Sequence, residues 1–122
     1  MEYSYSTEAK VVAHQAFWDL ISNGQASVEI KDADEVVLST IPLASGSVSQ
    51  ETGQLTIQPD GRDDEAAQSG EAYKAEILDG QGAVHLTMPC QQGTSSVAGY
   101  CVLTNTTIEQ GDPVEMQSLT IG

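Results

Sequence analysis

The sequence has few basic residues. Lys and Arg total 4 against 18 Asp and Glu, which gives a formal net charge of -14 over 122 residues. Nucleic-acid binding needs clustered Lys and Arg to neutralise phosphates, and docking on an anionic membrane surface needs a basic patch as well. The charge balance therefore predicts that neither nucleic acid nor a membrane is a partner of this protein.

Aromatic residues and long apolar runs are also scarce. Aromatic residues make up 5% of the chain and hydrophobic residues 39%, so the core is expected to be thin and aliphatic. No apolar run approaches the roughly 18 residues of a membrane-spanning helix. The segment Met1 to Ser6 is polar and lacks the basic and apolar regions of a signal peptide. We therefore expect a protein that is made and folds in a cytosol.

Cysteine occurs twice, as Cys90 and Cys101, on either side of residues 91–100. A hairpin over this segment could bring the two thiols together, so a disulfide is geometrically possible. A cytosolic compartment favours free thiols instead. The sequence leaves the state of this pair open.

One amphipathic helix is predicted near the N-terminus, from about Thr7 to Ser22, and residues 7–23 include its stop signal. Ser6 or Thr7 can act as the N-cap, and Glu8 lies in the first turn, where the helix dipole favours a negative charge. Asn23 and Gly24 supply a left-handed stop. The repeat of apolar residues every three or four positions forms the predicted stripe, which consists of Val12, Ala13, Ala16, Phe17, Leu20 and Ile21.

From residue 25 onward the apolar period changes from 3.6 to 2, which is typical of half-buried strands. Alternation recurs at residues 26–31, 36–41, 55–57, 73–77, 84–88 and 100–104, with turn signals between them. About seven or eight short strands predict a mainly β fold, a small antiparallel β-sandwich or barrel. The whole chain, 1–122, is predicted to be one domain, with an N-terminal arm (1–6), the helix (7–23) and the β-sandwich (25–122).

Three positions interrupt this pattern. Pro42 is expected to close its strand or to place its end on an edge. Residues 89–99 are expected to form a loop. Between Met116 and Leu119 the apolar phase shifts by one residue, which predicts a β-bulge near Gln117 and Ser118 or a crossing from one sheet to another.

Titratable residues form no convincing catalytic or metal-binding set. The loop 59–70 carries four acids, Asp60, Asp63, Asp64 and Glu65, but lacks the ligand spacing of a helix-loop-helix calcium site, which favours a solvated loop. His85 and Cys90 lack an identifiable orienting acid or amide, and His14 is expected to face solvent or a partner. We predict no catalytic residue, no metal site and no cofactor.

Aromatic residues gather at the N-terminus, as Tyr3, Tyr5, Phe17 and Trp18. Two interpretations are open: the aromatics pack the helix onto the sheet, or they form a protein interface, where aromatic residues are enriched. With Phe17 turned inward, Tyr3, Tyr5 and Trp18 are the candidates for contact with a partner.

The order of short motifs over about residues 16–121 resembles a family of small tailed-bacteriophage structural proteins rich in Ser, Thr, Gly and Ala. The resemblance follows the helix ending at Gly24, the strand pair that comes after it, and several short segments. These segments are Leu43-Ala44-Ser45, Gly53-Gln54-Leu55-Thr56, Ser69 to Asp79, Leu103 to Val114 and Leu119-Thr120-Ile121.

The resemblance implies a virion component, and within that class a capsid decoration (cement) protein. Such a protein would be made in the host cytoplasm, act in many copies or as a homo-oligomer, and bind the major capsid protein or another virion protein on the outer capsid surface. Acids placed in turns and on polar strand faces suit a surface that faces away from packaged DNA. The alternatives are a tail- or fibre-associated module, or a carbohydrate- or ligand-binding β-sandwich. The binding module would be identified by a cluster of exposed Trp and Tyr on one sheet face, which the sequence lacks beyond its N-terminus. An enzyme is not expected.

Overall fold

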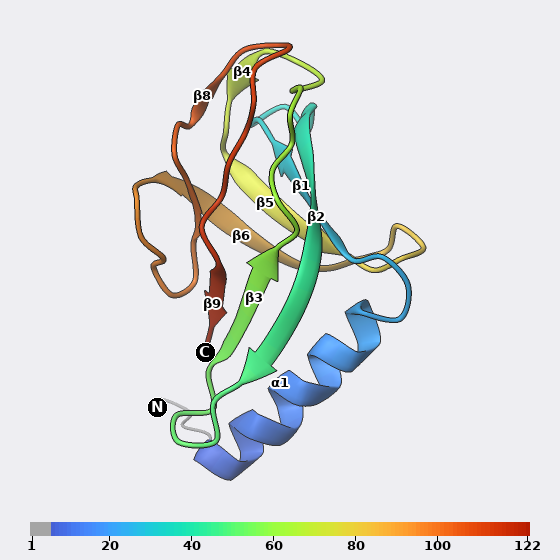
Figure 1. Ribbon diagram of the computed structural model, residues 1–122, viewed down its shortest axis with the longest axis vertical. Coiled ribbons are helices and arrows are strands. Elements are labelled where there is room, and N and C mark those ends of the chain that lie inside the picture. Colours follow the sequence, from blue (N-terminus) through green and yellow to red (C-terminus); the bar gives the residue numbers. More distant parts are fainter. Residues whose placement is uncertain (1–5) are drawn as a thin grey trace.

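The computed structural model describes residues 6–122 and is mainly β, with one N-terminal helix and nine strands (Figure 1). This confirms the predicted fold class. The elements are α1 (Thr7–Ile21), β1 (Ser27–Lys31), β2 (Val37–Val48), β3 (Leu55–Pro59), β4 (Gly70–Glu71), β5 (Lys74–Leu78), β6 (Val84–Gln92), β7 (Cys101–Leu103), β8 (Thr107–Ile108) and β9 (Leu119–Ile121).

Seven strands form one curved sheet in the order β7-β6-β5-β1-β2-β3-β9, and β4 and β8 pair separately at one end of the molecule (Figure 1). The two edges of the large sheet come together. The amide of Gln117 donates to the carbonyl of Val102 over 2.8 Å, and the amide of Gly99 donates to the carbonyl of Thr120 over 3.0 Å. The sheet is therefore a nearly closed barrel rather than a two-layer sandwich.

The centre of the sheet follows the alternation in the sequence. β1 pairs antiparallel with both β2 and β5 over its whole length. Val28 and Ile30 are fully buried in the barrel, while the alternate residues of β1 lie at intermediate exposure. Outside the barrel, Lys31 and Glu76 form a 2.5 Å ion pair across the β1–β5 ladder, and the Glu76 carboxylate raises the pKa of Lys31.

β2 corrects the prediction for Pro42, because the strand runs through this residue to Val48. Pro42 is the last residue of β2 paired with β1, and Leu43 is the first paired with β3. A bulge follows between Leu43 and Ser45. A proline, which has no N–H to donate, is tolerated beside such an irregularity and at a change of partner.

The closing edge of the barrel differs from the prediction more strongly. β6 continues to Gln92, so residues 89–92 are strand rather than loop, and β7 pairs with β6 in parallel, not antiparallel. Near Gln117, Met116 forms a bridge with Leu103 of β7, whereas Leu119 pairs with β3. The shift in apolar phase is thus the point where the chain passes from one strand partner to another.

α1 has the predicted bounds and caps. The Ser6 hydroxyl oxygen accepts from the Ala9 amide over 3.1 Å, and Gly24 adopts a φ of 104° just after the helix. Beyond the helix the chain touches the β5–β6 turn, because a Cβ on Gly80 would lie 2.8 Å from the Gly24 Cα. Only glycines allow these two backbones to approach so closely.

The helix docks through only part of the predicted apolar stripe, together with Trp18 and His14 beside it. Ile21 is fully buried, and Phe17 and Trp18 are half-buried against the barrel core. The Nδ1 of His14 lies 2.6 Å from the carbonyl oxygen of Gly53 in the β2–β3 turn. Because a carbonyl only accepts, Nδ1 carries the proton and donates it. The expectation that His14 faces solvent or a partner is therefore wrong.

Candidate functional site

The candidate functional site is the solvent-facing side of α1. Five apolar residues there share one face at helical spacing and are all exposed, Val12 by 66% and Leu20 by 53%. We call this face the outer stripe; it consists of Ala9, Val12, Ala13, Ala16 and Leu20.

The predicted apolar stripe combined two faces of the helix. Of its six residues, Phe17 and Ile21 pack on the barrel, whereas the other four are exposed and belong to the outer stripe. Alanine is compatible with either side of a helix, so spacing alone could not separate the docked face from the exposed one. The sequence does carry one signal of the exposed face. The apolar residues of this helix cover more of its circumference than the single face that a surface helix buries.

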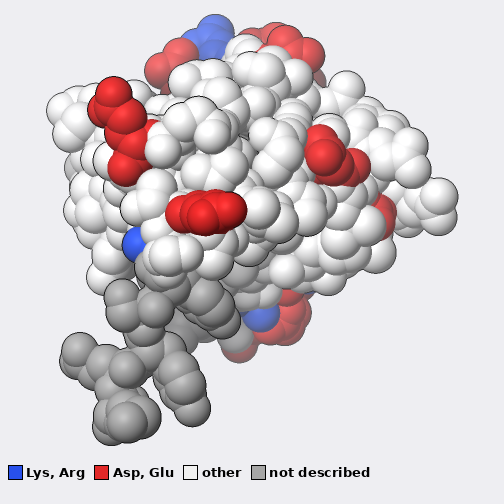
Figure 2. Space-filling view, turned by 90° about the horizontal axis from the view of Figure 1, so that it is seen from below, with Lys and Arg blue, Asp and Glu red and all other residues white. Residues whose placement is uncertain are grey.

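The charged residues of this helix lie beside the outer stripe rather than in it. α1 carries Glu8, Lys10 and Asp19, and none of the three is a member of the stripe. Figure 2, which views the molecule from the end that carries α1, shows the acids as separate groups with uncharged surface between them. Depletion of charged residues is the compositional mark of the core of a protein interface.

Of the three predicted interface residues, Trp18 is the one that the structure describes. Its ring lies over Gly46 of β2, so closely that a Cβ at position 46 would sit 2.5 Å from the indole. Trp18 therefore anchors the helix to the barrel. Its role in a partner contact stays a prediction, and Tyr3 and Tyr5 lie outside the described residues.

Side chains of the acidic loop 59–70 form hydrogen bonds and ion pairs with neighbouring residues. The Ser39 hydroxyl donates to Asp63 over 2.6 Å, and Arg62 forms ion pairs with Asp64 at 3.0 Å and Glu115 at 3.2 Å. Within residues 6–122, no group of three or more His, Cys, Asp or Glu side chains is arranged to hold a metal ion.

His85 and Cys90 are not brought together as a catalytic pair. The Nε2 of His85 lies 2.9 Å from a carboxylate oxygen of Asp79, in the turn between β5 and β6. This contact, together with the amides of Ala83 and Gln81, lowers the pKa of Asp79 to about 2. Cys90 instead faces Cys101, which is directly opposite it in the β6–β7 ladder.

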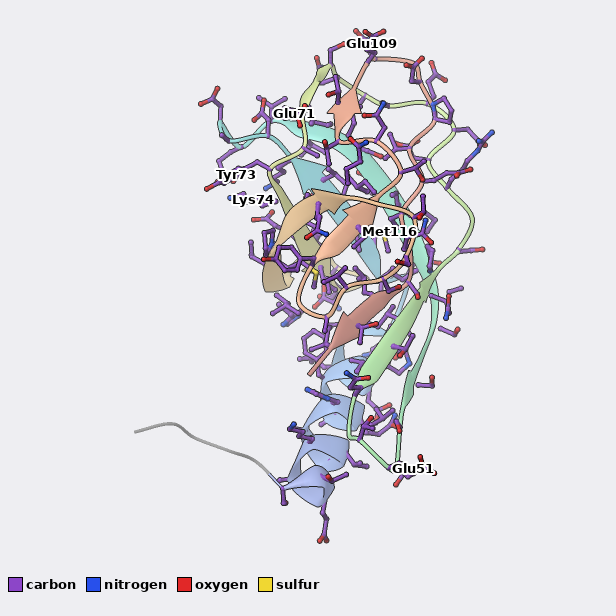
Figure 3. All side chains as sticks on the ribbon, turned by 90° about the vertical axis from the view of Figure 1, so that its left-hand side faces the viewer. Glu51, Glu71, Tyr73, Lys74, Glu109 and Met116 are labelled. Carbon is purple, nitrogen blue, oxygen red and sulfur yellow. The ribbon has the colours of Figure 1, made fainter. Side chains whose placement is uncertain are left out.

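Shallow hollows lie on the barrel. Two of them, of about 230 and 380 Å³, have Arg62 and Glu115 in their walls, where the guanidinium is already paired with carboxylates. A third, of about 270 Å³, is lined by Tyr73, Lys74 and Pro89, of which Tyr73 and Lys74 are labelled in Figure 3. Lys74 is paired with Glu35 and lowers the pKa of that carboxyl. None of these walls combines a nucleophile, a base and an orienting group among the described residues.

In the part of the chain that the structure describes, α1 does not have the length and hydropathy needed to cross a bilayer. Exposed aromatic side chains on the barrel are Tyr73, at 62% exposure, and Tyr100, at 38%. Of the exposed large apolar residues, two belong to the outer stripe of α1, Val12 and Leu20. Comparison of the chain with protein-family models, with curated proteins and with solved structures finds no match.

Proposed function

We propose that this protein is a non-enzymatic bacteriophage structural protein that decorates the outside of the capsid, with the outer stripe of α1 as its contact with the shell protein. The resemblance to small tailed-phage structural proteins supports the class. The observation that carries the contact is the outer stripe itself: an exposed, uncharged apolar face on a helix whose opposite face is anchored by Trp18 and Ile21.

The anchoring of the helix favours this role. A rigid helix face loses little conformational entropy on binding, and here the Trp18–Gly46 contact and the His14–Gly53 hydrogen bond hold the helix on the barrel. The small side chains Ala9, Ala13 and Ala16 allow a partner backbone to come close. Val12 and Leu20 supply the larger apolar side chains.

A contact of this size suits a protein that acts in many copies. One helix face buries less surface than a stable binary complex needs, which is about 800 Å² per partner. On a shell, however, neighbouring copies bind together, and linked weak contacts raise the overall affinity. The acids, which lie mainly away from the outer stripe, would keep the exposed barrel soluble.

The test is occupancy on purified heads of the phage that encodes the chain. Val12→Gln with Leu20→Gln keeps good helix formers while making the stripe polar. We expect the double variant to lose at least about tenfold in affinity for the heads, since a contact made mainly by apolar burial loses two side chains. Quantitative mass spectrometry of sedimented particles gives the copy number.

Val84→Gln is the matched control, because Val84 is also an exposed valine, at 47%, but belongs to β6 and not to the outer stripe. It should bind as the unaltered protein does. A chain that lacks residues 1–5 keeps the Ser6 cap and tests the predicted contribution of Tyr3 and Tyr5. Full occupancy by the double variant would contradict the outer stripe as the contact, and full occupancy by the shortened chain would contradict the contribution of Tyr3 and Tyr5. Binding to purified tails rather than heads would favour the tail-associated alternative.

A further inference from the structure

The two cysteines lie at the closing edge of the barrel. Cys90 of β6 and Cys101 of β7 are direct partners in the parallel ladder, so their side chains leave the sheet on the same side. Adjacent strands are about 4.8 Å apart, which is within the Cα separation of about 4.4 to 6.8 Å that a disulfide spans. Both thiols are free in the structure.

We propose that Cys90 and Cys101 form a reversible redox pair, which a small-molecule disulfide such as oxidised glutathione converts to an intramolecular bridge that locks β7 onto β6. The pairing already exists in the reduced protein, so oxidation needs no rearrangement of the strands. This proposal is independent of the capsid function, because it rests on the register of two strands.

The environments of the two sulfurs differ, which sets the order of the chemistry. Cys90 is half-buried, whereas Cys101 is fully buried. The hydrogen bond between the thiols lowers the pKa of Cys90, and the same contact with burial raises the pKa of Cys101. Cys90 is thus both the more accessible thiol and the one more readily ionised, so it reacts first.

The reaction proceeds in two balanced exchanges. The Cys90 thiolate attacks one sulfur of oxidised glutathione, the glutathione S–S bond breaks, and one glutathione thiolate leaves and takes a proton. Cys101 then gives up its proton to solvent and attacks the Cys90 sulfur, which releases the second glutathione. The protein dithiol is oxidised by two electrons, and oxidised glutathione is reduced to two molecules of glutathione.

The bridge would add a covalent link to one of the short strands of the barrel. β7 has three residues and is held to β6 by three residue pairs. Linking Cys90 to Cys101 closes a short loop, residues 91–100, and removes conformational freedom mainly from the unfolded chain. We expect the midpoint of thermal unfolding to rise by about 10 °C on oxidation and to return when dithiothreitol is added.

The experiment treats the purified full chain with oxidised glutathione and follows its mass and its thermal unfolding. The expected product is a monomer about 2 Da lighter, with one peptide pair linked between Cys90 and Cys101 after non-reducing digestion. Mass unchanged, glutathione retained on the unaltered chain, or bridges between two chains would overturn the proposal. This measurement needs no substitution, so it does not depend on whether a variant folds.

Two single variants test the order of reaction. Cys101→Ala removes the resolving thiol and should accumulate the mixed disulfide between glutathione and Cys90. Cys90→Ala leaves the buried thiol alone and should react at least about tenfold more slowly in the folded state. Equal rates for the two variants would contradict the assignment of Cys90 as the attacking thiol, and far-ultraviolet circular dichroism confirms that each is folded.

Discussion

The centre and the seam of the barrel are built differently. In the centre, β1 pairs over five residues with β2 on one side and with β5 on the other. In the seam, where β7 and its flanking residues meet residues 115–121, the chain uses a three-residue strand, an isolated bridge between Leu103 and Met116, and single hydrogen bonds donated by the amides of Gly99, Thr104 and Gln117. The centre therefore has many cooperating contacts, whereas the seam opens at lower cost.

Similar cavities made in the centre and in the seam test most directly whether the two regions differ in rigidity. Ile30 of β1 and Leu103 of β7 are each fully buried. We expect Ile30→Ala to lower the free energy of unfolding by about 4 kcal/mol and Leu103→Ala by about 2.5 kcal/mol, because the cost is smaller where surrounding structure can relax into the space. Urea unfolding monitored by circular dichroism measures both.

The exposed Thr87→Ala on β6 is the control for this pair and should change stability by less than about 0.5 kcal/mol. If Leu103→Ala costs as much as Ile30→Ala, the seam is as rigid as the centre and the distinction fails.

A second, smaller effect tests whether α1 behaves as part of the centre. Gly46→Ala places a Cβ 2.5 Å from the Trp18 ring, which must move. Overpacking of this kind costs about 2 kcal/mol. Because Trp18 is the only tryptophan, its fluorescence reports the displacement directly, and we expect a red shift as the ring becomes more exposed.

Ser45→Ala, at the neighbouring exposed position of β2, is the matched control for Gly46→Ala. It should leave both the emission wavelength and the stability unchanged. An unshifted emission in Gly46→Ala would show that the helix accommodates the methyl group without moving, and so is not tightly docked.

The smallest expected effect concerns pH at the β5–β6 turn. The pKa of Asp79 is lowered to about 2, chiefly by His85, from an ordinary value near 3.8. A carboxyl whose pKa is lower when folded stabilises the protein in its ionised form, so the contribution is complete above about pH 4 and is lost as pH falls towards 2. The stability difference between the unaltered protein and Asp79→Asn should therefore shrink over this range.

Unfolding measured at several values between pH 2 and pH 6 checks this expectation. His85→Asn removes the principal cause and should move the Asp79 transition, followed by carboxyl carbon chemical shifts, up towards its ordinary pKa. A difference between the unaltered protein and Asp79→Asn that is constant with pH would contradict the assignment.

The elements that could be predicted are those decided by neighbouring residues. The Ser6 cap and Gly24 stop bound the helix, and the alternation around Val28 and Ile30 marks β1, because side-chain period and turn chemistry act over a few residues. The pairing of β6 with β7 could not be predicted in this way. The parallel pairing of Cys90 with Cys101 depends on a strand partner across the loop 91–100, and nothing local to either strand specifies its direction.

In the candidate site, too, some features are decided by neighbouring residues and others by distant parts of the chain. The sequence by itself determined that the chain is acidic, mainly β and headed by one apolar-rich helix. Only the tertiary structure decided which side of that helix is buried. Trp18 packs on Gly46 and His14 bonds to the carbonyl of Gly53. The opposite side, with Val12 and Leu20, therefore stays exposed. Helical spacing identifies which residues share a face, but the surface that covers a face is assembled from distant parts of the chain.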